Sequence, residues 1–361
     1  MSTRAFRLAA SLALSGGSVL AFLLLAEGTA RLVGVSVGTV QINRGVVRMS
    51  PNPKLGFELR PNSRVASEVE YRINGDGFRG PALRDKRAGE RRVAVFGDSI
   101  VFGYWVAEAD AFPAQIGTIL GPRVETLNLG VPGYNLDQEV EHLRQRVDTL
   151  QPDHVVFGFC LNDLEGLLSF EYGLTQSRKE ARSGPRRALE SLLSFSRFAA
   201  WIEYRLTERE ARAQFARARN PLGGELYEVT PEALDAHLDA SFGVLAATLK
   251  ARGIEGTVAI FPVLGNRFEN YPYKALHAQI AAAAARAGLG AIDMLPCFEP
   301  YPFRDVRVDV VHPNPFGHRI AAHSVADVLW GDLFPGEAKP PSLNRSCASY
   351  EAKDFAAVEG Y

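Results

Sequence analysis

The chain has 361 residues, of which 47% are hydrophobic and 22% charged, and its formal net charge is −1. This composition is typical of a globular protein and excludes a disordered chain, and the near-zero charge gives no electrostatic case for a nucleic-acid partner. The three cysteines are too few for a disulfide framework or a cysteine-rich zinc site. If the domain lies outside the cytoplasm, a single disulfide between Cys297 and Cys347 is an alternative to free thiols.

Residues 1–33 are expected to form a short cytoplasmic tip and a transmembrane anchor. Residues 8–26 contain no charged side chain, and about 20 apolar helical residues span a bilayer. Two arginines precede this run, so the positive-inside rule sends the rest of the chain to the periplasm or the exterior. A cleaved signal peptide, with its cleavage site at 28–30, is the alternative. The length of the run and the helical spacing of Glu27 and Arg31 favour a retained anchor.

Residues 34–90 are expected to form a connecting region. Turn-forming residues gather at 50–53 and 74–77. The charged run at 84–87 is interpreted as a solvated linker.

Residues 91–335 show a regular alternation of apolar runs and helical patterns. Strands are expected at 92–96, 124–128, 154–160, 257–261 and 291–294. Helices are expected at 110–120, 136–150, 275–287 and 314–330, with another opened by Thr230 and Pro231. Such alternation predicts an α/β domain with a parallel sheet of about five strands covered on both faces. The C-terminal tail is assigned to 336–361.

An insertion at 164–229 interrupts this alternation. Its composition is helical, with apolar residues at helical spacing among many arginines and glutamates. Because the insertion follows the third strand, it is expected to lie above the carboxyl edge of the sheet. We interpret it as a helical cap that shapes a substrate pocket, with a self-contained helical hairpin as the plainer alternative.

Three residues have the chemistry of a nucleophilic triad. Ser99 follows the first strand in Gly97-Asp98-Ser99-Ile100, but a serine hydroxyl is a weak nucleophile without a base. His312 can be that base, and Asp309, three residues earlier, can accept its Nδ1–H and leave Nε2 free. A loop aspartate and a helix-capping histidine would be the structural alternative for this pair.

Two further positions can stabilise the negative oxygen that acyl transfer creates. Gly133 follows the second strand and offers a backbone N–H, whereas Asn162 follows the third strand and offers a side-chain amide. Ligands of parallel sheets bind at the carboxyl ends of the strands, where Ser99 and the pair Asp309–His312 are also expected. The convergence of separate segments on one edge predicts an active site there.

No metal or other cofactor is expected. The remaining histidines form no ligand spacing; they are His142, His154, His237, His277, His318 and His323. Cys160 ends an apolar strand and is expected to be a core residue, not a nucleophile. Position 101 is Val, so the Gly-x-Ser-x-Gly elbow of the α/β-hydrolases is absent around Ser99.

Four motifs in order resemble those of the SGNH (GDSL) hydrolase superfamily. They are Gly97-Asp98-Ser99-Ile100, Gly133 five residues after Asn128, Asn162-Asp163, and Asp309-Val310-Val311-His312. The third motif departs from the usual Gly-x-Asn-Asp, because its glycine lies two residues too early. The resemblance covers about 91–330 and implies a flavodoxin-like three-layer α/β/α fold. It also implies Ser99 as nucleophile, His312 as base, Asp309 as its orienter, and Ser99, Gly133 and Asn162 as oxyanion donors.

The N-terminal anchor followed by Asn74-Gly75-Asp76-Gly77-Phe78-Arg79-Gly80 resembles a bacterial subgroup of these proteins. The leading interpretation is therefore a membrane-anchored serine esterase that hydrolyses acyl or acetyl esters of carbohydrate or lipid. One alternative keeps the triad but transfers the acyl group to a cell-envelope or extracellular polysaccharide. Another is a non-catalytic polysaccharide-binding or assembly factor. The sequence leaves protein partners and the oligomeric state open.

Overall fold

The computed structural model describes residues 3–33, 42, 45–66, 69–164, 196–199, 202, 231–265, 268–343, 346 and 347. Its centre is a five-stranded parallel sheet with the strand order β6-β5-β7-β8-β9. In chain order the strands are β5 (Arg91–Gly97), β6 (Val124–Gly130), β7 (His154–Phe159), β8 (Glu255–Ile260) and β9 (Gly290–Asp293). These strands confirm the expected α/β class, and the central ones are buried apolar runs because helices cover both faces.

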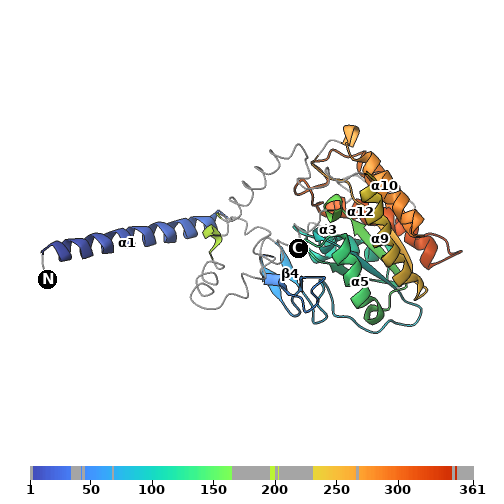
Figure 1. Ribbon diagram of the computed structural model, residues 1–361, viewed down its shortest axis with the longest axis horizontal. Coiled ribbons are helices and arrows are strands. Elements are labelled where there is room, and N and C mark those ends of the chain that lie inside the picture. Colours follow the sequence, from blue (N-terminus) through green and yellow to red (C-terminus); the bar gives the residue numbers. More distant parts are fainter. Residues whose placement is uncertain are drawn as a thin grey trace.

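Helices form the two outer layers (Figure 1). On one face α4 (Phe112–Leu120) packs against α12 (Pro315–Leu333), and on the other α9 (Pro231–Lys250) packs between α5 (Leu136–Leu150) and α10 (Lys274–Arg286). The short helices α3 (Ser99–Phe102) and α11 (Leu295–Phe298) follow β5 and β9. Their starts follow local rules: Asn135 caps α5 in a capping box with Gln138, and Asn314 caps α12.

The apolar N-terminal segment forms helix α1 (Thr3–Leu32), which extends away from the globular part (Figure 1). Its stretch Ala13–Leu32 is long and apolar enough to cross a membrane or to act as a signal sequence, and only 6% of it is buried. The helix continues past 28–30, and Glu27 pairs with Arg31 at 2.6 Å, four residues on. These contacts agree with the continuous helix expected from the sequence.

Residues 45–80 carry more regular structure than the connecting region expected from their turns. Two hairpins pair β1 (Val47–Met49) with β2 (Phe57–Leu59), and β3 (Arg64–Ala66) with β4 (Glu70–Arg72). Their buried side chains form a second hydrophobic cluster together with residues of the α/β domain, namely Phe102, Tyr104, Val131 and Tyr134. The hairpins are therefore packed onto the α/β domain.

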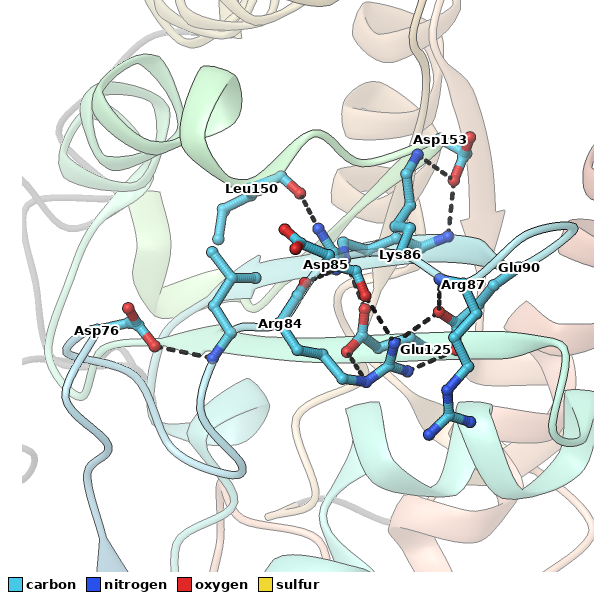
Figure 2. A network of polar contacts seen from close by, with 11 residues as sticks. Asp76, Arg84, Asp85, Lys86, Arg87, Glu90, Glu125, Leu150 and Asp153 are labelled. Carbon is cyan, nitrogen blue, oxygen red and sulfur yellow. Dashed lines mark hydrogen bonds and ion pairs between the residues drawn. The ribbon is translucent and has the colours of Figure 1, made fainter.

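The charged run at 84–87 is an irregular loop in which the side chains of Arg84 and Lys86 form ion pairs (Figure 2). Arg84 binds Glu90 and Glu125, and Lys86 contacts Asp153 at 3.1 Å. The buried Arg92 donates to Glu125 and to the carbonyl oxygens of Leu150 and Arg84. These contacts fasten the loop to the amino ends of the central strands.

Most of the insertion at 164–229, and with it the proposed cap, lies outside the described residues. Within the described part, Ser196 donates to Glu27 of α1 at 2.8 Å, and the ring of Phe198 packs edge-on against Phe22 at 6.2 Å. Near the C-terminus, Cys297 and Cys347 form the disulfide that the sequence left open.

Candidate active site

Ser99 lies at the carboxyl end of the central strand β5. Asp98 caps the short helix α3 by accepting the Ile100 N–H at 2.8 Å, which holds Ser99 in the first turn. Glycine is required beside this turn: a Cβ on Gly130 would lie 2.1 Å from the Phe102 nitrogen. The close approach of β6 to α3 therefore depends on Gly130.

The structure brings Ser99, His312 and Asp309 together. The Ser99 hydroxyl lies 2.9 Å from His312 Nε2, and His312 Nδ1 lies 2.8 Å from Asp309 Oδ2. A proton on Nδ1 donated to the carboxylate leaves the Nε2 lone pair facing the hydroxyl. The Asp98 carboxylate is a second acceptor for the hydroxyl, but at 3.3 Å it is the longer contact.

Asp309 is held by its own loop. Its Oδ1 accepts the backbone N–H groups of Val311 at 2.9 Å and His312 at 2.8 Å. Burial alone would raise the pKa of the Asp309 carboxyl, but its hydrogen bonds and charge interaction with His312 lower this pKa to about 2. The carboxylate is therefore ionised at neutral pH, as a partner for an imidazolium must be.

Trp105 is a further residue of this site, which the sequence did not reveal. Its indole Nε1–H donates to Asp309 Oδ2 at 3.2 Å, and its backbone sits in the left-handed region with φ +67°. The backbone N–H of Trp105 donates to the Tyr71 hydroxyl of β4 at 2.8 Å. The neighbouring Tyr104 ring packs edge-on against the His312 ring at 5.5 Å. The β3–β4 hairpin thus supports the loop that contacts the acid and base.

A buried arginine holds the start of that loop. Arg79 is 1% exposed and donates to the carbonyl oxygens of Phe102, Gly103 and Val106 at 2.6–2.9 Å. Its guanidinium also lies 4.8 Å from the centre of the Tyr71 ring. Burial lowers the pKa of Arg79, yet an arginine stays charged at neutral pH. Charge-assisted bonds to three carbonyls therefore fix the turn between Ser99 and Trp105.

The two expected oxyanion donors lie at the same edge of the sheet. Asn162 donates one Nδ2 hydrogen to Asp98 at 2.9 Å, and its second Nδ2 hydrogen can be donated to an oxyanion. Gly133 lies in the turn after β6 with φ +81°, a backbone conformation that favours glycine. Because β5, β6 and β7 are parallel neighbours, the residues that follow them meet at one edge.

Cys160 is close to this edge but is not equipped as a nucleophile. The residue is buried and its thiol is free. Burial, with the neighbouring Asp98 charge, raises the pKa of the Cys160 thiol well above its usual value. The thiol stays protonated at neutral pH, which agrees with the core position expected from the sequence.

A three-layer α/β/α fold with these motifs at the carboxyl edge of its parallel sheet defines a hydrolase of the SGNH superfamily. The chain belongs to the GDSL-like lipase/acylhydrolase family, whose sequence profile matches residues 95–320. It is accordingly a hydrolase that acts on ester bonds, and the resemblance read from the four motifs is confirmed. No curated protein matches the chain in sequence.

Solved structures of similar fold include esterases. A lipase/acylhydrolase from Enterococcus faecalis is 17% identical, with 69% of this chain and 100% of that one covered and a TM-score of 0.41. A carbohydrate acetylesterase from Sinorhizobium meliloti is 14% identical, with 68% and 100% covered and a TM-score of 0.42. The inhibitor-bound aryl esterase of M. smegmatis is 14% identical, with 66% and 98% covered and a TM-score of 0.39.

Proposed function

We propose that the protein is a membrane-anchored, exported serine esterase whose nucleophile is Ser99. The observation that carries this proposal is the continuous hydrogen-bonded series from Ser99 Oγ through His312 to Asp309, with contacts of 2.9 and 2.8 Å. The substrate class we propose is an acyl or acetyl ester of a carbohydrate or lipid.

In the first half of the reaction, Ser99 Oγ attacks the ester carbonyl while its proton moves to His312 Nε2. The negative charge of the Asp309 carboxylate stabilises the His312 imidazolium that forms. The carbonyl oxygen becomes negative and is bound by donors from Ser99, Gly133 and Asn162. When the tetrahedral intermediate collapses, His312 returns the proton to the departing alcohol, and an acyl-serine remains.

In the second half, a water molecule takes the position of the alcohol. His312 Nε2 accepts a proton from this water, whose oxygen attacks the acyl-serine carbonyl. Collapse of the second intermediate releases the carboxylic acid and returns the proton to Ser99 Oγ. A sugar hydroxyl in place of the water would give acyl transfer by the same residues, so product analysis has to separate the two reactions.

The test uses the full chain in detergent. Ser99→Ala should abolish hydrolysis of p-nitrophenyl acetate and labelling by a fluorophosphonate probe, because the attacking oxygen is lost. The control is Ser63→Ala, since among the residues that the structure describes the Ser63 hydroxyl donates only to the Arg60 carbonyl, within the N-terminal hairpins. Wild-type turnover by Ser99→Ala would refute the assignment. Mass analysis of products with an acceptor sugar present would distinguish transfer from hydrolysis.

A further inference from the structure

Three potential metal ligands meet at the amino edge of the sheet, the edge opposite to Ser99. His154 and Glu255 are the first residues of the neighbouring strands β7 and β8 and are paired in register. Asp332 lies in the last turn of α12. One ligand atom from each side chain lies within 4.8 Å of the other two.

The imidazole of His154 is oriented for this purpose. The side chain is only 2% exposed, and its Nε2 lies 2.9 Å from the Thr257 hydroxyl. Its Nδ1 faces Asp332, with Oδ2 at 3.9 Å, and forms no hydrogen bond within the described part of the chain. Histidines that bind metals have this arrangement, in which one ring nitrogen is fixed by a neighbour and the other points at the ion.

The charges around the site favour a cation. Neither Glu255 nor Asp332 pairs with a lysine or arginine among the residues that the structure describes, whereas the nearby Asp153 contacts Lys86 at 3.1 Å. The last turn of α12 contains no basic residue, although the negative end of the helix dipole lies there. Two carboxylates and a helix C-terminus therefore produce an uncompensated negative potential.

We propose that His154, Glu255 and Asp332 bind a divalent transition-metal ion of the zinc type. One imidazole nitrogen and two carboxylate oxygens are ligands that Zn²⁺ accepts, and water can complete a tetrahedral shell. No short sequence motif indicates the site, because its ligands come from three separate elements.

A metal here would be structural. The strands of the sheet are about six residues long, so the site lies roughly 20 Å from Ser99. However, α12 begins three residues after His312 and ends at Leu333, directly after Asp332. An ion bound to Asp332 would therefore join the far end of this helix to β7 and β8 without entering the ester chemistry.

The test is calorimetric titration of the metal-free full chain with Zn²⁺. We expect one ion per chain and at least a tenfold weaker affinity in Asp332→Asn and in Glu255→Gln. The matched control is Asp327→Asn, which removes another carboxylate of α12, one that pairs with Lys339. A rise in thermal stability with Zn²⁺ should occur in the wild type and the control only.

Two results would overturn the proposal: the absence of a bound ion, or equal Zn²⁺ affinity in all four proteins. Equal affinity would place the ion elsewhere, for example on His312. Esterase activity is not a readout of this experiment, so its outcome is independent of the function proposed for Ser99.

Discussion

Replacing Trp105 by Phe tests whether the indole contact orients the acid of the site. The change keeps an aromatic ring and removes the Nε1–H that donates to Asp309 Oδ2 at 3.2 Å. A hydrogen bond to a charged acceptor contributes about 1.5–3 kcal/mol. This contact is long, and Asp309 keeps its bonds with Val311 and His312, so we take the lower end, about 1.5 kcal/mol. That value corresponds to a roughly tenfold loss of kcat.

The assay is ester hydrolysis by the full chain at neutral pH, with kcat and KM determined separately. Trp105 acts through Asp309, so we expect kcat to fall while KM changes little. In proton NMR spectra, the chemical shift of the proton between His312 Nδ1 and Asp309 should also change, because this shift reports directly on that hydrogen bond. A purely structural role would leave this chemical shift unchanged in the molecules that remain folded.

Trp330→Phe is the matched control. Its indole also donates a single hydrogen bond, to the Glu337 carbonyl at 3.3 Å, and lies within α12 far from the triad. We expect a similar small loss of thermal stability and an unchanged kcat. If Trp105→Phe retained full kcat, or if both variants lost activity equally, the indole would not be positioning Asp309.

Three further predictions concern stability. Burial lowers the pKa of His142 to about 3, so below pH 6.5 only the unfolded chain takes up this proton, and stability falls as pH falls. In wild type this proton uptake lowers the free energy of unfolding by about 2 kcal/mol between pH 7 and 5, and His142→Leu should remove that part of the decline in urea unfolding. An unchanged dependence of the unfolding free energy on pH would contradict this. Gly130→Ala should cost about 2 kcal/mol and lower activity, because the new Cβ displaces α3, whereas Gly331→Ala has open space and should cost nothing in the same assays. Reduction of the Cys297–Cys347 bridge should lower stability by about 2–4 kcal/mol in thermal unfolding, and equal melting temperatures with and without reductant would exclude that contribution.

The α/β domain was predictable because its signals are local. The expected strand at 92–96 became β5 at Arg91–Gly97, since an apolar run this short between turns has the length of a buried strand and not that of a helix. The expected helix at 136–150 became α5 at Leu136–Leu150, with its apolar face buried. Ser99, His312 and Asp309 could be proposed as a group because each belongs to a short characteristic motif, and the structure brings the three side chains together.

The parts that escaped prediction depend on contacts between distant segments. The strands of 45–80 have three residues each, too few to show an alternating pattern. Trp105 and Asp309 are 204 residues apart, and an isolated tryptophan after a glycine turn gives no sign of such a contact. His154, Glu255 and Asp332 form no spacing pattern for the same reason.

The attachment of the N-terminal hairpins has a practical consequence for truncation. The Tyr71 hydroxyl accepts the Trp105 backbone N–H, and Arg79 donates to three carbonyls of the turn that follows Ser99. A protein cut at residue 90 would expose the aromatic surface of Phe102 and Tyr104 and would aggregate or lose activity. To obtain a soluble enzyme without α1, the cut belongs before residue 42, so that the hairpins stay with the domain they complete.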